Sequence, residues 1–429
     1  MTTAAATPRQ LLNFIHRSPS PYHVVQTSMD LLKEAGFTEL SPHAPWELHE
    51  GGSYVVTAFD SSLLAFTIGR HPRAHLRIAA AHTDFPCLRV KPAASIMQGV
   101  YGKLNIELYG GMIRESWLDR PLSLAGKIAT TGTDPFHPAI HVVDFHTPLL
   151  TIPRLAIHMN RHTNDGVALN PQKDMLPLMT LCDGSTADSF LLDYLAEYCH
   201  CAVQDILSYD LTVYPAEEGC LLGLHNEFIS SPRLDNLTSV YASIAGLANH
   251  TAADGIQAVA LFDNEEVGSR TKQGAASLLL PTYLQRLYHA LGYTDEDYRL
   301  DQSSAFVLSI DVAHAMHPNM PEKCDITNIP VLGHGIALKT ACSQAYAGDA
   351  EAAAIITALC RSGNIPYQHF VNRSDIPGGS TLGSLLSSYF PVRTMDIGIP
   401  ILAMHSAREL MGAADLKALY DLIGLFFTE

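Results

Sequence analysis

The sequence lacks the features that mark membrane-spanning, secreted and disulfide-stabilised proteins. No apolar run approaches the roughly 20 residues that a membrane span requires. The first nine residues are small and polar, without the hydrophobic core of a secretory signal. Eight cysteines in 429 residues do not make a disulfide scaffold, and no Cys-x-x-Cys pair occurs. We therefore expect a soluble, cytoplasmic protein.

Basic residues are also scarce. The chain has 27 Lys and Arg against 43 Asp and Glu, a formal net charge of −16. Nucleic acids and anionic membranes both require a basic footprint, so this balance argues against either as a partner. Apolar residues make up 47% and charged residues 16%, which excludes an intrinsically disordered chain. At about two to three times the length of a typical domain, the chain should form more than one folding unit.

Short apolar runs alternate with helical patterns in the first and last parts of the chain. The runs that predict buried strands are 75–81, 258–262, 305–310 and 399–404. The helical patterns are 8–15, with Thr7 as N-cap, 240–247 and 350–360. Strands that are apolar on both faces predict an α/β sheet covered by helices on both sides.

The middle of the chain has a different pattern, with shorter β segments separated by turns. Examples are 124–129, 140–145 and 155–158. We predict a mainly β domain at 91–223, inserted into an α/β domain formed by 1–90 and 224–429.

Histidines and acidic residues follow the four apolar runs. They are His82, Asp84, Glu265, Glu266, Asp311 and His405, and Asp235 precedes a predicted helix. Ligands of open α/β sheets bind outside the carboxyl ends of the strands, so these side chains should meet at one rim. A sheltered cluster of like charges is costly unless something positive lies in it. Mixed histidine and carboxylate ligation suits zinc, with manganese or cobalt as alternatives.

Two metal ions account for this ligand set. One bridging carboxylate, with one histidine and one carboxylate on each ion, would use five protein ligands. These are His82, Asp235, Asp311, His405 and one of the pair Glu265 and Glu266. The other glutamate would act as general base, and the pattern alone does not say which is which.

Nine blocks of the sequence resemble the aspartyl aminopeptidases, family eighteen of the metallopeptidases. The blocks are SPSPYH at 18–23, AHTD at 81–84, WLDRPLSL at 117–124, IPRLAIH at 152–158, RLDN at 233–236, DNEEVGS at 263–269, DVAHA at 311–315, NRSDIPGGST at 372–381 and MHSARE at 404–409. The resemblance implies a zinc-exopeptidase-like α/β domain with an inserted β domain used in subunit contacts. It also implies removal of an N-terminal residue, preferably Asp or Glu, from peptides by a metal-activated water.

The resemblance implies a role for each residue at the rim. The metal ligands would be His82, Asp235, Glu266, Asp311 and His405, with Asp235 bridging two zinc ions. Glu265 resembles the family's base, and Asp84 resembles the carboxylate that orients His82.

Four further residues are candidates for substrate binding. Lys339 and His314 resemble the groups that read an acidic substrate side chain, although without the resemblance Lys339 is more typical of a solvated strand end. Tyr346 could line the same pocket or belong to the core. Gly379 lies in a Gly-Gly-Ser-Thr loop that no Lys-Ser/Thr follows, so we expect a contact with the substrate backbone rather than a P-loop.

The resemblance also implies a large closed homo-oligomer such as a dodecamer, in which His158 reaches a neighbouring subunit's active site. Two other functions remain open from the residues alone. One is another dizinc hydrolase, a deacylase or carboxypeptidase, and the other is a non-enzymatic peptide-binding or shell-forming protein.

Overall fold

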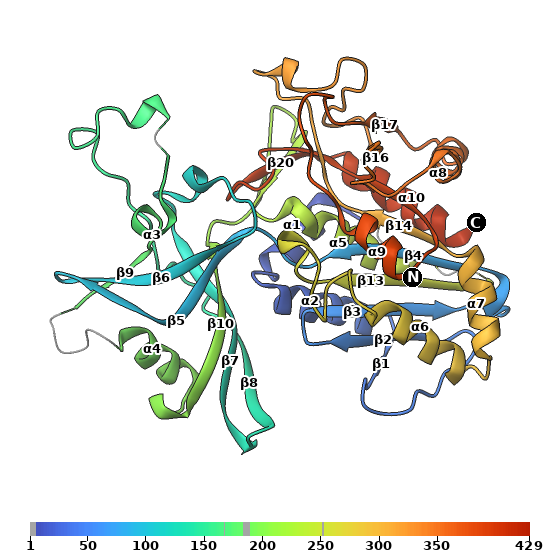
Figure 1. Cartoon of the computed structure of the whole chain (residues 1–429), viewed down its shortest axis with the longest axis horizontal. Helices are drawn as coiled ribbons and strands as arrows, with labels where there is room; N and C mark the ends of the chain where they lie inside the picture. Colours follow the sequence, from blue (N-terminus) through green and yellow to red (C-terminus); the bar gives the residue numbers. More distant parts are fainter. Residues whose placement is uncertain (1–5, 167, 183–188, 251–252) are drawn as a thin grey trace. The chain divides into compact units, whose positions relative to one another are not determined.

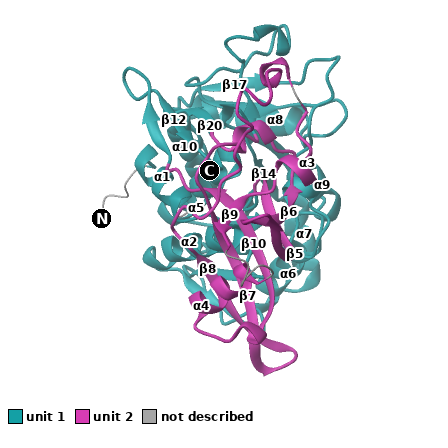
Figure 2. Ribbon diagram, turned by 90° about the vertical axis from the view of Figure 1, so that its left-hand side faces the viewer, with its two compact units in different colours: residues 1–84, 219–404, 409–429 teal, residues 85–218, 405–408 magenta. Residues whose placement is uncertain are grey.

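A computed structural model describes residues 6–166, 168–182, 189–250 and 253–429 (Figure 1). The chain divides into two compact units (Figure 2). Residues 1–84, 219–404 and 409–429 form the first unit, and 85–218 with 405–408 form the second. The predicted insertion, 91–223, lies in the second unit except for its last five residues. Its status as a separate domain stays a prediction.

The first unit is built on a nine-stranded sheet. In spatial order its strands are β1 (Thr38–Leu40), β2 (Ser53–Ala58), β3 (Ser62–Ile68), β13 (Ile256–Phe262), β4 (Leu76–His82), β14 (Phe306–Ile310), β18 (Arg393–Gly398), β16 (Ile336–Lys339) and β17 (Tyr367–Phe370). The four central strands, β13, β4, β14 and β18, run parallel, so their carboxyl ends meet at one edge.

Helices cover both faces of this sheet. They are α1 (Pro8–His16), α2 (Pro21–Glu34), α5 (Leu234–Asn249), α6 (Leu279–Ala290), α7 (Asp295–Ser304), α8 (Ala350–Ser362), α9 (Leu382–Tyr389) and α10 (Asp415–Thr428). One face packs on α6 and α9 in a core that contains Ala80, Val307 and Leu386. On the other face, the Phe306 ring lies 5.6 Å from Phe426 of α10. The predicted fold class is confirmed.

The N-terminal helix begins where the sequence predicts. Thr7 caps α1 through a capping box in which the side chains of Thr7 and Gln10 bond each other's backbone amides. The ring of Phe14 then lies 5.6 Å from Tyr241 of α5, so α1 packs on the helix that carries Asp235.

A smaller five-stranded sheet completes the first unit. Its strands are β11 (Cys220–Leu222), β12 (Phe228–Ser231), β20 (Glu409–Gly412), β19 (Pro400–Leu402) and β15 (Ala313–His314). The run 399–404 therefore contributes to this smaller sheet. Our expectation that it belongs to the large sheet is wrong. The reason is that β18 already occupies the place beside β14, and the chain leaves the large sheet at Gly398.

The second unit contains a six-stranded antiparallel sheet. In order its strands are β8 (His137–Asp144), β7 (Leu122–Asp134), β10 (Ile206–Pro215), β5 (Cys87–Gln98), β6 (Tyr101–Tyr109) and β9 (Leu178–Leu181). Its α-helices within the described residues are α3 (Pro171–Asp174) and α4 (Phe190–Cys199). No helix in the described part of the chain is long and apolar enough to cross a membrane.

The predicted strand at 155–158 is wrong. The segment is an exposed turn, in which the amides of Met159 and Asn160 both donate to the carbonyl oxygen of Ala156. The carbonyl oxygen of Ala156 is therefore used within the turn and not in a ladder with a neighbouring strand.

Candidate metal centre and active site

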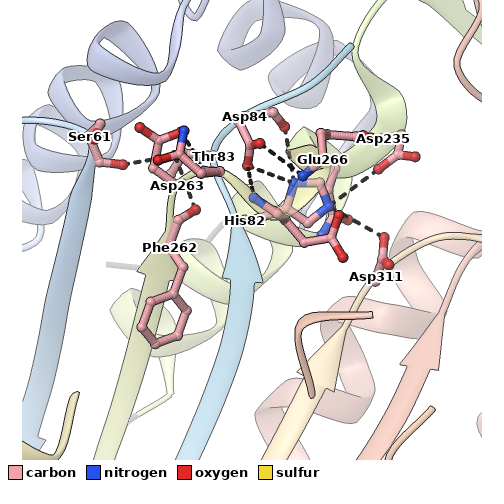
Figure 3. A network of polar contacts seen from close by, with 12 residues as sticks. Ser61, His82, Thr83, Asp84, Asp235, Phe262, Asp263, Glu266 and Asp311 are labelled. Atoms are coloured by element: carbon pink, nitrogen blue, oxygen red, sulfur yellow. Dashed lines mark hydrogen bonds and ion pairs between the residues drawn. The ribbon is translucent and has the colours of Figure 1, made fainter. Parts of the chain in front are cut away.

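His82, the last residue of β4, lies at the centre of a buried cluster (Figure 3). Its Nε2 is 3.5 Å from Oδ1 of Asp235 and 3.6 Å from Oδ1 of Asp311. Strand register explains this meeting, because Ala80 pairs with Ser309 and each of these side chains stands two residues further along its own strand. The sheet thus brings His82 and Asp311 together from positions 229 residues apart in the sequence.

The strand end that carries His82 is anchored by two hydrogen bonds of Thr83. The hydroxyl of Thr83 donates to the carbonyl oxygen of Ser61 at 2.8 Å and lies 3.2 Å from that of Phe262 (Figure 3). These bonds hold the main chain where β4 leaves the sheet, by tying it to the residue before β3 and to the last residue of β13.

The electrostatics of the cluster favour a cation. Burial would lower the pKa of His82, but Asp235, Asp311 and Asp84 outweigh it and raise this pKa well above its ordinary value. So many carboxylates in a buried place are stable only with positive charge among them. The ligand atoms of His82, Asp235 and Asp311 lie within 4.8 Å of one another, as do those of His82, Glu265 and Glu266. The donor set therefore fits zinc.

Asp84 contacts both the histidine and the glutamate pair. Its Oδ1 lies 3.4 Å from Nδ1 of His82, and its backbone oxygen lies 3.0 Å from the same nitrogen. Oδ1 also accepts the amide of Glu265 at 3.0 Å, and Oδ2 accepts the amide of Glu266 at 3.1 Å. Sequence reasoning missed these two bonds, because a side-chain contact to a backbone amide leaves no mark on residue type.

Glu265 and Glu266 begin a short 3₁₀ turn, Glu265–Val267, after β13. Burial raises the pKa of Glu265 to about 8, assisted by Asp311, Asp84 and Asp235 and opposed by His82. A carboxyl whose pKa lies near neutrality is suited to accept and return a proton.

Asp235 is held at the start of α5 by two residues with no assigned role in the sequence reasoning. Its amide donates to Oε2 of the buried Glu409 at 3.0 Å. The side chain of Asn236 donates to the carbonyl oxygen of Ile310 at 2.9 Å, which ties this turn to β14. The peptide bond between Asp235 and Asn236 is cis. The sequence offered one signal for the role of Glu409, namely its position in the family-like block 404–409.

A second group of predicted residues meets beside Asp311. Lys339 is 2% exposed, and its Nζ lies 3.6 Å from Oδ2 of Asp311 and 5.3 Å from the centre of the Tyr346 ring. The solvated strand end is therefore the wrong alternative for Lys339. Tyr346 is buried, and both its ring and that of the exposed His314 lie 5.8 Å from Phe370, a residue that sequence reasoning missed.

Three predicted residues remain, one in a loop of the first unit and two in the second unit. Gly379 is exposed in the loop before α9, and a side chain added there would meet nothing within 4 Å. His158 lies in the exposed turn of the second unit. His405 also belongs to the second unit, where its Nδ1 lies 3.0 Å from the carbonyl oxygen of Gly111. Their functional roles stay predictions.

Comparison with known proteins gives consistent matches over nearly the whole chain. The family described as aminopeptidase I zinc metalloprotease (M18) matches residues 14–427. A probable M18 family aminopeptidase 2 of Clostridium novyi (strain NT) is 42% identical over 95% of both chains, and one of Pseudomonas savastanoi pv. phaseolicola is 37% identical over 97% of both.

Two solved structures are similar as well. A chain of the Ape4 and Nbr1 complex superposes with a TM-score of 0.93 at 34% identity, covering 98% of this chain and 85% of that one. A chain of the S. cerevisiae mApe1 dodecamer superposes with a TM-score of 0.83 at 26% identity, covering 98% and 96%.

Proposed function

We propose, from the premise that the chain belongs to the M18 family of zinc metallo-aminopeptidases, that it removes N-terminal Asp or Glu residues from peptides at a site for two zinc ions. The observation that carries the proposal is buried His82 with the carboxylates of Asp235 and Asp311 within 3.6 Å of its Nε2. Family membership favours an aminopeptidase over a deacylase or carboxypeptidase and over a non-enzymatic protein.

The proposed ligands are the five that the resemblance implies. They are His82, Asp235, Glu266, Asp311 and His405. The first four lie in the first unit, and the buried contacts around His82 support its role together with those of Asp235 and Asp311. Zinc, when bound, would supply a Lewis acid that polarises the scissile carbonyl and lowers the pKa of water to about 7.

Glu265 is the proposed general base. It would take the proton of the attacking water and return it to the leaving amine. Asp84 holds the amides of Glu265 and Glu266 with separate carboxylate oxygens, so it fixes the main chain from which the base projects. The same carboxylate also contacts His82, so Asp84 fixes the position of the base relative to this metal ligand.

Acidic specificity requires a local cation. With a formal charge of −16, the chain repels acidic peptides at long range, although salt screens this repulsion beyond about 8 Å. Lys339 is the proposed cation, because its ammonium is buried beside Asp311. His314 and Tyr346 would line the same pocket, and the Gly379 loop would contact the substrate backbone.

We further propose a closed homo-oligomer in which His158 completes a neighbouring subunit's site. The S. cerevisiae relative is a dodecamer. Closed symmetry would turn the sites toward a shared interior that admits only peptides. If so, mixing a Glu265→Gln chain with a His158→Ala chain should restore part of the activity that each lacks. Absence of rescue in verified mixed oligomers would remove His158 from the site.

The central experiment combines metal analysis with a panel of aminoacyl substrates. Purified protein should contain close to two zinc ions per chain and should cleave aspartyl and glutamyl substrates faster than leucyl ones. One ion per fully active chain would contradict the two-zinc site, and faster cleavage of leucyl substrates would contradict the acidic preference.

A further inference from the structure

A row of paired residues crosses the large sheet two residues before His82 and Asp311. Ala80 of β4 pairs with Ser309 of β14, and Ser309 pairs with Asp396 of β18. The register of β16 on β18, with Leu338 opposite Ile397, places Lys339 beside Asp396 when it is continued by one pair. Neighbouring side chains in paired strands point to the same face. Asp396 therefore stands next to Lys339, on the side away from Phe370.

Asp396 is a buried carboxylate surrounded by polar groups. It is 0% exposed, and its Oδ2 accepts the amide of Ala347. The hydroxyls of Ser309 and Thr381 act on the same carboxylate and, like Lys339, favour its charged form. Burial raises the pKa of Asp396 to about 6, and Lys339 is the largest influence that opposes the rise.

The helix over this carboxylate closes the site tightly. A side chain at Gly383 of α9 would begin 2.7 Å from both oxygens of Asp396 and 2.5 Å from the hydroxyl of Ser309. A glycine is thus required where the helix crosses, and no bulkier residue could enter between the helix and Asp396. The carboxylate is built into a sealed place.

Lys339 needs a second negative charge if Asp311 binds metal. Its ammonium is buried 3.6 Å from Asp311, which in the proposed site gives its charge to zinc. An ammonium left beside two divalent cations would be repelled, and a buried charge without a partner is strongly destabilising. The carboxylate on the neighbouring strand can supply the missing charge.

We infer that Asp396 is the second counter-ion of Lys339 and stabilises the lysine ammonium through space from the neighbouring strand, while Asp311 is the carboxylate within ion-pair distance of it. Asp396 is then a positioning residue, which acts on the substrate pocket only through Lys339. The inference rests on the proposed function for its catalytic consequence, whereas the Asp396–Lys339 pair itself does not depend on it. If Asp396 served only to bind the amide of Ala347, its substitution and that of Lys339 would have additive effects on stability in a double-mutant cycle.

The test uses the full chain with Asp396→Asn, Lys339→Met and the double variant. The matched control is Asp301→Asn. It removes a buried carboxylate of α7 that pairs with Arg73. The first measurement is the thermal midpoint of zinc-loaded protein, with zinc-free protein as a reference in which Asp311 still pairs with Lys339. Each single variant should lower it, and the double variant should lower it by clearly less than the sum, because both members of the pair are gone. Additive losses would overturn the inference.

The second measurement is kcat/KM for glutamyl and leucyl substrates. Asp396→Asn should lower the glutamyl-to-leucyl ratio by about tenfold, the scale of one hydrogen bond to a charged group. It should have no further effect in the Lys339→Met background, and Asp301→Asn should leave the ratio unchanged. An effect of Asp396→Asn that persists without Lys339, or an unchanged ratio, would overturn the positioning role.

Two outcomes separate this inference from the proposed function. If the wild-type chain shows no acidic preference, the proposed specificity fails while the thermal coupling still decides the pair. If Asp396→Asn alone does not fold, recovery of folding in the double variant supports the pair. A double variant that does not fold, when Lys339→Met does, overturns it.

Discussion

The central strands of the first unit are buried along almost their whole length, whereas those of the second unit are buried along only part of theirs. Every residue of β13 and β14 is buried, while the second half of β5 and the first half of β10 are largely exposed or half-buried. A charged side chain at the end of a fully buried strand is expensive and calls for a reason. The same side chain on a half-exposed strand is ordinary. The first unit therefore makes its polar residues informative.

The largest expected effect contrasts a histidine in each unit. His82→Ala should abolish tight zinc binding and activity. The loss should exceed the about 10–100-fold that follows when a residue hydrogen-bonded to a metal ligand is changed, because here the ligand itself is removed. His141→Ala, on β8 of the second unit and hydrogen-bonded to Thr130, should leave both unchanged. Metal analysis after dialysis and turnover of an acidic substrate check both. Equal losses would erase the contrast between the two sheets.

This contrast also explains how much of the fold and site the sequence could predict. The runs ending near His82, Glu265 and Asp311 were found because apolar residues fill both faces of their strands. The segment 155–158 was misassigned as a strand because an apolar run does not reveal whether its carbonyl oxygens accept hydrogen bonds within a turn.

Two buried residues of the first unit were harder to predict. The burial of Lys339 and the bond from Asp235 to Glu409 depend on neighbours distant in the chain. A charged residue has the same identity in solvent and in the core, so the pattern of the sequence alone could not place either one.

The second prediction sharpens the contrast with adjacent glutamates. Glu265→Gln should lower kcat by about 10²–10⁴ while zinc is retained, as expected for a general base. Glu266→Gln should instead lose zinc. In the second unit, Glu217→Gln, which removes a partly exposed pair with Arg120, should change neither. The reverse pattern at positions 265 and 266 would show that their roles are exchanged.

A lysine in each unit provides the third comparison. Lys339→Met should lower kcat/KM for glutamyl substrates about 10–100-fold more than for leucyl substrates, since a bond between charged groups is lost. Lys91 lies on β5 of the second unit, where its Nζ is near the side chain of Gln172. Lys91→Met should affect the cleavage of both substrates equally and weakly. Parallel losses on both substrates with Lys339→Met would remove it from specificity.

The smallest expected effect concerns the stability of the first unit. Burial raises the pKa of Asp415 from 3.8 to about 6, although its oxygens accept the amides of Gly333 and Gly335. A raised folded pKa stabilises the protein at low pH, and this contribution is lost as pH rises from about 4 to 6. It amounts to at most about 3 kcal/mol. Urea unfolding of Asp415→Asn should show a flatter pH dependence in this window, and an unchanged slope would contradict the argument.

The bonds of Asp84 have a practical consequence for finding natural peptides. Both of its oxygens hold main-chain amides of the glutamate pair, so the clamp does not depend on which side chain stands at position 265. A Glu265→Gln chain should therefore keep the shape of the pocket while turnover almost stops. Such a chain is a trap. Incubated with a cell's peptide pool and then washed, it should release the peptides it recognises intact, ready for sequencing by mass spectrometry.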